Sequence, residues 1–225
     1  ASMQCASGVT TSGFRVIRNS TRCRSWQEYA GIAVMAVDIT DKEDILVERA
    51  RTGDRSAQKS LYRLHIRYLT AVCTRYIINP EDVKDVLQES FMRIFSSLGA
   101  FEYRGPGSLK GWMSRIVVNQ SMKFLERSGR MVFTELTSDT ESSAGYHEPD
   151  LDEVPASVIH GLIRELPDGY RTIFNLYVIE EKSHKEIAGM LNIKESTSAS
   201  QLHRAKSMLA AKIKDYQTTN ERVTI

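Results

Sequence analysis

One segment restricts the fold of this chain more than any other, a long apolar stripe at helical spacing. From Val83 the apolar residues recur at i+4, i+8, i+11, i+12 and i+15, ending at Leu98. These intervals follow the period of an α-helix and not the alternation of a β-strand. The stripe begins just after Asn79-Pro80, a capping residue followed by the residue favoured at the first helical position. The spacing predicts an amphipathic helix that buries one face against other helices.

The same kind of helical patterning occurs on both sides of a polar, acidic stretch. Residues 134–155 contain no Lys or Arg and seven acidic residues, and no part of the chain shows strand alternation or a repeat. We therefore expect an all-α fold of two small helical domains joined by an acidic flexible linker. The expected divisions are a poorly ordered extension (1–38), a first domain (39–130), the linker (131–155), a second domain (156–216) and a tail (217–225).

Charge is distributed unevenly along the chain, although the net charge is only +2. Residues 42–133 hold 16 basic and 10 acidic residues, and residues 156–216 hold 9 basic and 7 acidic ones. Two basic blocks on either side of an acidic strip suit a polyanionic partner. Solvated helix faces give the same counts, and charge alone favours that simpler explanation.

Several classes of function lack their usual sequence signals. Cys5, Cys23 and Cys73 are widely spaced, with no CxxC or Cys/His cluster, so we expect no zinc site and no disulfide framework. No apolar run approaches the roughly 20 residues that span a bilayer. There is no Walker motif and no convincing catalytic triad. We expect a cytoplasmic protein that is not inserted in a membrane, is not an enzyme, and needs no metal or other cofactor.

Residues 183–191 and 195–212 have a pattern typical of a helix-turn-helix. The first helix begins at the capping-box sequence S-x-x-E, and a short break around Ile193 precedes the second. Four side chains are expected on the outer face of the second helix, within reach of base edges or phosphates: Ser200, Gln201, His203 and Arg204. An ordinary pair of packed helices with solvated polar residues is the alternative.

The first domain offers two further candidate surfaces. The helix after Pro80 carries an acidic and polar face with one methionine, which suits docking on a basic helical partner, although solvated faces of this kind are commoner. A helix over about 109–127 follows a Gly-rich loop and carries basic residues at four-residue spacing beside Trp112. That combination suits phosphate contact and stacking on unpaired bases, while Trp112 serves equally well as a core residue.

Several runs, in order along the chain, resemble the ECF sigma factors of bacterial RNA polymerase. Residues 82–95 (DVKDVLQESFMRIF) resemble region 2.2 of that family, and residues 101–119 (FEYRGPGSLKGWMSRIVVN) resemble its regions 2.3 and 2.4. Its region 4 is resembled by residues 166–174 (LPDGYRTIF), 185–191 (KEIAGML) and 196–206 (STSASQLHRAK). Together the runs extend over most of the two expected domains.

The resemblance implies a sigma factor that binds core RNA polymerase, through its β and β′ subunits, and directs promoter recognition, melting and initiation. Docking on the clamp helices of β′ would fall to Asp85, Gln88, Glu89 and Met92. Recognition and melting of the minus-ten element of promoter DNA, with capture of a flipped base, would fall to Arg104, Ser108, Trp112, Asn119 and Lys123. Recognition of the minus-thirty-five element would fall to the outer face of the second region 4 helix. The family also implies an anti-sigma factor as a partner.

This sequence departs from the family pattern at one point. Ala199 and Gln201 stand where many relatives carry basic residues, which would weaken phosphate anchoring. A helix-turn-helix repressor or activator that never joins polymerase is the alternative function, but it leaves the acidic face and the Trp112 loop without a role. A nuclease would need carboxylates clustered on a metal, whereas the acids here lie mostly in the linker and on one helix face.

Overall fold

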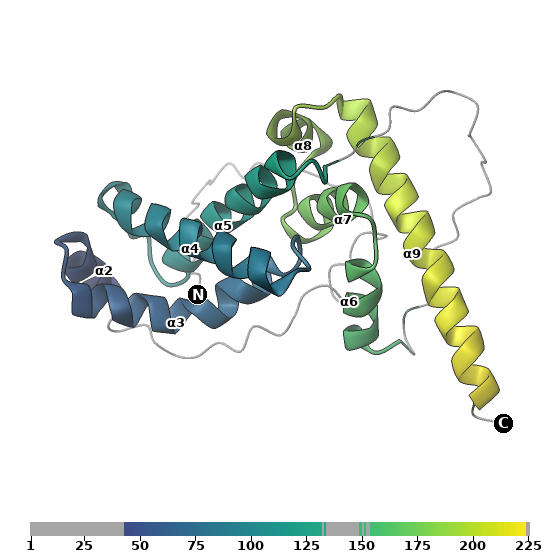
Figure 1. The fold of residues 1–225 in the computed structure, drawn as a ribbon, viewed down its shortest axis with the longest axis horizontal. Helices are drawn as coiled ribbons and strands as arrows, with labels where there is room; N and C mark the ends of the chain where they lie inside the picture. Colours follow the sequence, from purple (N-terminus) through teal and green to yellow (C-terminus); the bar gives the residue numbers. More distant parts are fainter. Residues whose placement is uncertain (1–42, 132, 134–148, 150, 152–153, 224–225) are drawn as a thin grey trace, which may run out of the picture.

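The computed structural model describes residues 43–131, 133, 149, 151 and 154–223 (Figure 1). Throughout this part of the chain the regular structure is helical, with no strand, which confirms the all-α prediction. The expected extension at 1–38 and most of the linker lie outside the described residues. The domain boundaries therefore stay predictions.

The first group of helices packs around the stripe that began at Val83. Its elements are α2 (Glu43–Arg51), α3 (Arg55–Cys73), α4 (Pro80–Ser97), the 3-10 turn η1 (Leu98–Ala100) and α5 (Ser108–Arg127). Most of the stripe is buried between α3 and α5; Phe95 is half-buried, and Leu98 lies in η1. Asn79 caps α4 as expected, since its Oδ1 accepts the N–H groups of Glu81 at 2.8 Å and of Asp82 at 3.5 Å.

The second group packs against one long helix. Its elements are α6 (Ala156–Arg164), α7 (Asp168–Phe174), the π-helical turn η3 (Asn175–Ile179), α8 (His184–Leu191) and α9 (Glu195–Val223). Figure 1 shows α9 running past α8, α7 and α6 in turn, and all three contact it. The helix extends beyond residue 212, where the predicted helix-turn-helix ends, because no Gly or Pro occurs between 195 and 223 to stop it.

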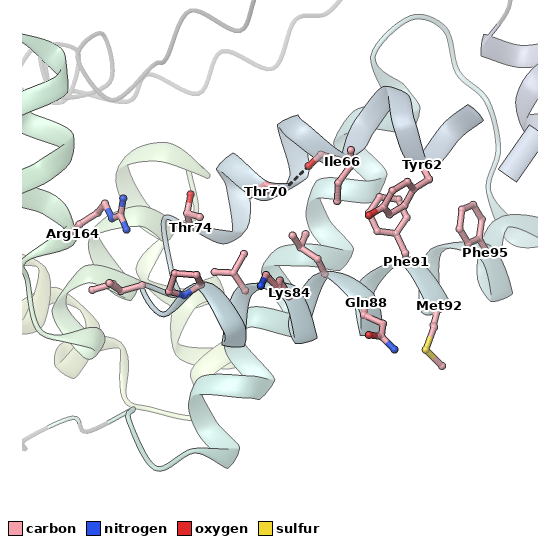
Figure 2. A pocket seen from close by; sticks show the side chains of 14 residues that line it. Tyr62, Ile66, Thr70, Thr74, Lys84, Gln88, Phe91, Met92, Phe95 and Arg164 are labelled. Carbon is pink, nitrogen blue, oxygen red and sulfur yellow. Dashed lines mark hydrogen bonds between the residues drawn. The ribbon is translucent and has the colours of Figure 1, made fainter. Parts of the chain in front are cut away.

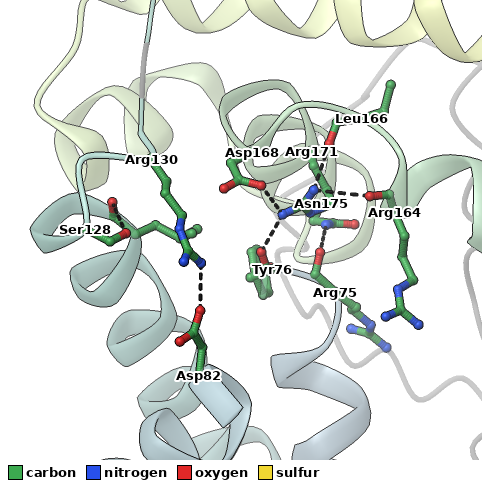
Figure 3. A network of polar contacts seen from close by, with 11 residues as sticks. Arg75, Tyr76, Asp82, Ser128, Arg130, Arg164, Leu166, Asp168, Arg171 and Asn175 are labelled. Carbon is green, nitrogen blue, oxygen red and sulfur yellow. Dashed lines mark hydrogen bonds and ion pairs between the residues drawn. The ribbon is translucent and has the colours of Figure 1, made fainter. Parts of the chain in front are cut away.

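The two groups meet where α3 ends. Tyr76, three residues beyond α3, is fully buried, and α7 approaches the chain at this point (Figure 3). The buried apolar side chains of both groups form a single cluster. The described helices therefore make one packed body, with the second group attached to the C-terminal end of α3.

The Asn79 cap gives a direct test of what begins α4. We predict that Asn79→Ala lowers the free energy of unfolding by about 1 kcal/mol, because two N–H groups lose their acceptor. Urea unfolding followed by far-UV circular dichroism measures this. Asn119→Ala is the matched control, since this exposed asparagine lies inside α5, where alanine is the better helix former. A midpoint that moves equally in both variants would contradict the capping role.

Candidate functional site

The helix-turn-helix begins at a reciprocal cap. The Ser183 hydroxyl accepts the backbone N–H of Glu186 at 3.2 Å, and the Glu186 carboxylate accepts the backbone N–H of Ser183 at 2.8 Å. Hydrogen bonds from the Ser183 backbone and hydroxyl lower the pKa of Glu186 to about 2. Asn192 ends α8 in the left-handed region at φ 52°, which turns the chain into α9. The capping box predicted from the sequence is confirmed.

A histidine holds the turn between α8 and α9. His184 Nδ1 lies 3.0 Å from Ser198 Oγ, and its ring stacks on Tyr177 with centroids 4.6 Å apart. Burial lowers the pKa of His184, and Lys206 adds to this effect while Glu195 opposes it. The ring therefore ties the start of α8 to the first turn of α9.

The outer face of α9 differs from the expectation at one residue. His203 is exposed, and Ser200 and Arg204 are half-buried, so all three side chains reach solvent to some extent. Gln201 is only 2% exposed, so its expected place on the outer face is wrong. The reason is helical spacing, because Gln201 follows buried Ser198 by three residues and precedes buried Ala205 by four.

The outer face of α5 presents the residues expected at the minus-ten element. Asn119 and Lys123 are exposed and lie one turn apart on the same helix face. They line a depression of about 300 Å³ with Ile116, Arg93 of α4 and Met190 of α8. An amide and an ammonium group thus stand side by side at the edge of a shallow hollow.

The loop before α5 is held by Ser108. Its hydroxyl accepts the backbone N–H of Arg104 at 3.2 Å and donates to the carbonyl of Gly105 at 2.7 Å. Gly107 lies at φ 82°, a region that disfavours side chains, so the turn needs glycine there. Arg104 is exposed and pairs with Glu102 at 3.0 Å. Ser108 therefore shapes the loop, and the Arg104 side chain reaches solvent.

The position of Trp112 is compatible with both core packing and stacking on an unpaired base. Its ring packs on Phe101 with centroids 5.0 Å apart, and the residue is half-buried. One side therefore rests on the core and part of the indole stays accessible. Its spacing from Asn119, seven residues or about two turns, places both on the same side of α5.

The acidic and polar face of α4 is exposed as a unit. Asp85, Gln88, Glu89 and Met92 are all exposed, and Met92 reaches 66%. Glu89 pairs with Arg127 of α5 at 3.1 Å. The structure thus brings the four residues predicted for partner docking together on one helix face.

An apolar groove that the sequence reasoning missed adjoins this face (Figure 2). It has a volume of about 780 Å³ and is lined mainly by apolar side chains of α3 and α4. The Tyr62 and Phe91 rings, 4.6 Å apart, form one wall, and Gln88 and Met92 stand at its rim. The available signal was Tyr62 and Ile66, an apolar i, i+4 pair outside the buried stripe of α3.

Two other features are absent among the residues whose positions the structure describes. No group of three or more His, Cys, Asp or Glu side chains there is placed to hold a metal ion. Of the helices covered, none is both long and apolar enough to cross a membrane.

Comparison with known proteins identifies the family. The family model for Sigma-70 region 2 matches residues 61–131, and that for Sigma-70 region 4 matches residues 157–209. The ECF RNA polymerase sigma-E factor of Haemophilus influenzae is 32% identical over 190 residues, covering 80% of this chain and 98% of the relative. This chain belongs to the ECF sigma factor family.

A second sequence relative agrees with the assignment. The RNA polymerase sigma-H factor of Pseudomonas aeruginosa is 28% identical over 181 residues, covering 75% of this chain and 92% of the relative. A solved structure, of CnrH in complex with the cytosolic domain of CnrY, is 20% identical with a TM-score of 0.42, covering 78% of this chain and 99% of that one. The ECF sigma factor directs transcription initiation by RNA polymerase, in a family of initiation factors rather than enzymes. The family membership decides against a repressor that never joins polymerase.

We predict that His184 of this sigma factor titrates below pH 6.5 and that acid weakens the helix-turn-helix. Since burial disfavours the charged ring, the unfolded chain binds the proton more readily than the folded chain. The stabilisation is complete above pH 6.5 and declines as the pH falls toward the lower pKa of the folded state. NMR titration of the imidazole, with thermal unfolding near neutral and at about pH 5, measures both effects.

A non-titrating variant is the control for this measurement. His184→Gln keeps a polar group beside Ser198 and should remove this part of the pH dependence. A measured pKa at or above 6.5 for His184 would contradict the role given to burial.

Proposed function

We propose that this sigma factor docks on the β′ subunit of core polymerase through α4, opens the minus-ten element with α5, and reads the minus-thirty-five element with α9. The observation that carries the proposal is the outer face of α5. Exposed Asn119 and Lys123 lie there on the same side as part-accessible Trp112, behind a loop that needs glycine. As a polymerase subunit the protein would act in the cytoplasm, where the promoter DNA lies.

The chemistry of α5 fits the capture of an unpaired base. Flipping a base out of the duplex costs a few kcal/mol, and stacking on an aromatic side chain returns about 1–3 kcal/mol per base. The Asn119 amide can both donate and accept hydrogen bonds, and the Lys123 ammonium favours an adjacent phosphate. Arg104, exposed in the loop before α5, adds a second positive charge for the backbone. Closed duplex DNA gains nothing from the stacking surface, so binding favours the opened state.

The face of α4 suits a basic helical partner such as the β′ clamp. Asp85 supplies negative charge, and the flexible Met92 side chain adapts to apolar contacts. Glu89 already pairs with Arg127, so a cation of β′ would replace or join that arginine. Docking would then be guided by charge and held by the apolar contact of Met92.

The remaining surfaces serve two further partners in this proposal. On α9, Ser200, His203 and Arg204 would read the minus-thirty-five element, and buried Gln201 is left to helix packing. An anti-sigma factor would cover the apolar groove of α3 and α4, because a groove of about 780 Å³ lined by Tyr62 and Phe91 favours an apolar helix over water. A partner seated there would also cover Gln88 and Met92, in competition with β′.

The melting role predicts a specific kinetic defect. Asn119→Ala and Lys123→Ala should each slow open-complex formation by roughly ten- to a hundredfold, because losing a hydrogen bond to an unpaired base or a charged contact with phosphate costs about 1–3 kcal/mol. Recruitment of holoenzyme to duplex promoter should change little. Permanganate reactivity of promoter thymines, measured beside run-off yield, follows the opening step.

A template mismatched across the minus-ten region provides the decisive comparison, because the cost of melting is already met. On this template both variants should regain most of their activity. Lys59→Ala, which removes an exposed charge on α3, is the charge-matched control and should behave as wild type. Variants that melt duplex promoter as fast as wild type, or that lose duplex binding outright, would show that α5 has another role.

Docking through α4 predicts a binding defect instead. Asp85→Arg combined with Gln88→Ala should weaken association with core polymerase by about 2 kcal/mol, roughly thirtyfold in Kd. Far-UV circular dichroism should stay unchanged, since both side chains are exposed. Asp215→Arg makes the same charge reversal at an exposed position of α9 and serves as the control in the titration with core polymerase. If the α4 double variant bound core polymerase as tightly as Asp215→Arg does, α4 would not be part of the interface.

A further inference from the structure

The groove between α3 and α4 leaves large apolar side chains in contact with water (Figure 2). Tyr62, Ile78 and Met92 line it, with exposed fractions of 43%, 44% and 66%. On α3 its lining residues Tyr62, Ile66 and Thr70 recur every four positions, so the groove runs along that helix. Exposed apolar patches of this kind commonly mark the place where a partner binds. An elongated apolar groove suits a helix as the partner.

A row of cations runs beside the groove on α3. Its members recur every four residues, and all four side chains are exposed. Residues three positions apart are neighbours on a helix surface. Lys59, Arg63 and Arg67 each precede a groove-lining residue of α3 by three positions, so the row borders the groove. The cationic row consists of Arg55, Lys59, Arg63 and Arg67.

No acidic side chain of α3 compensates the cationic row, since the helix contains no Asp or Glu among its 19 residues. Cations at four-residue spacing repel one another, and Arg55 also lies at the positive end of the helix dipole. No member of the row forms an ion pair with a residue that the structure describes. The row therefore weakens the free helix and gains most from an anionic partner. Other cations of the first group do pair with acids of that group: Arg49, Arg51, Lys84, Arg104, Arg127 and Arg130.

The other edge of the groove, on α4, carries the opposite charge. Asp85 precedes the groove-lining Gln88 by three residues. Glu89 precedes Met92 by the same interval. A helix in the groove therefore meets cations along one edge and carboxylates along the other. A helix with one acidic edge pairs that edge with the cations in only one of the two directions in which it can lie.

A nucleic-acid backbone fits the cationic row less well than a helix does. Phosphates pair with cations, but they leave the apolar groove beside the row empty. The carboxylates on α4 also repel a polyanion from the groove. An amphipathic helix fills the groove with its apolar face and pairs with the cations along its edge at the same time.

We infer that the groove binds an amphipathic helix whose edge along α3 is acidic. The inference rests on the proposed function, in which an anti-sigma factor covers the groove, and it names the charge of the helix that this factor supplies. The β′ subunit uses the acidic edge on α4 instead, so the two partners differ in the edge to which they are drawn. Substitutions in the cationic row therefore separate the binding of one partner from that of the other.

Two synthetic peptides test the charge of the edge. Each has about 18 residues, long enough for a helix, with a leucine stripe at helical spacing and glutamine at most other positions. One edge beside the leucines carries glutamate in the first peptide and lysine in the second. Fluorescence anisotropy of the labelled peptides, titrated with the full chain, gives each Kd.

We expect Arg63→Glu combined with Arg67→Glu to weaken binding of the glutamate peptide about tenfold, because two attractive pairs become repulsive. The lysine peptide should bind this variant at least as tightly as wild type. Tyr62→Ser should weaken both peptides, because both place leucine against that ring. Lys185→Glu combined with Lys214→Glu makes the same change of charge at exposed positions of α8 and α9. This control should alter neither Kd by more than about twofold.

A milder substitution guards against a change of fold. Arg63→Gln combined with Arg67→Gln removes the two charges without reversing them and should weaken the glutamate peptide by a smaller factor. It replaces the charge reversal if circular dichroism shows that the reversal unfolds α3. Added salt should also weaken binding of the glutamate peptide to wild type, because exposed charges are screened.

Three results would overturn the acidic edge. One is a glutamate peptide that binds the cationic-row variants as tightly as wild type, or that fails to bind wild type at all. Another is unchanged binding of the peptide to Tyr62→Ser, which would place it outside the groove. The third is a duplex oligonucleotide that displaces the glutamate peptide from wild type and binds the charge-reversed variant more weakly. That result would assign the cationic row to a phosphate backbone.

A failure of the proposed function alone has a different signature. In the proposed function a partner in the groove covers Gln88 and Met92 and competes with β′, so saturating glutamate peptide should displace core polymerase. If only that function is wrong, the peptide still binds wild type and distinguishes the variants as expected, but core polymerase stays bound in its presence.

Discussion

The packing of α3 is the interaction on which the rest of the structure depends. Its buried face, which includes Leu61 and Leu69, contacts α2, α4 and α5, and its last buried residue, Cys73, lies 3.7 Å from Ser121 of α5 through their side chains. Beyond Cys73 the chain supplies the carbonyl groups to which α7 is attached. One helix therefore organises the first group along its length and holds the second group at its end.

The candidate functional surfaces are the helix faces that this packing leaves exposed. α5 buries Met113 and Val117 against its neighbours, which leaves Asn119 and Lys123 facing solvent. α4 likewise buries the stripe from Val83 and leaves its acidic and polar face outside. In each case the surface is the complement of a buried stripe, so rigid packing positions the side chains and no loop has to order them.

Local patterns in the sequence were sufficient for most of the fold and for most of the site. The cap at Asn79, the capping box at Ser183 and the stripe on α4 depend on residues within a few turns of one another, and all three occur as expected. Gln201 departs from its predicted exposure because polar character alone predicts a solvent-facing side chain, whereas its spacing matches the buried face of α9. The contact of Arg171 with Tyr76 joins residues 95 positions apart, and no periodicity reports such a pairing. The groove was missed for the same reason, since its walls come from two helices.

The π-helical turn η3 has a consequence for how such a sigma factor evolves. Asn175 begins this turn, and Glu180 follows it by five residues, the interval that a π-helix brings back to the same face. In an α-helix the same interval would rotate Glu180 well over 100° away from Asn175. Deleting one residue within the turn would leave these two side chains four residues apart, an interval that an α-helix also brings to one face. The loss of one codon can therefore convert the turn to α-helix while Asn175 and Glu180 stay on one face, so lineages can lose the π-helical turn and keep both side chains toward α3.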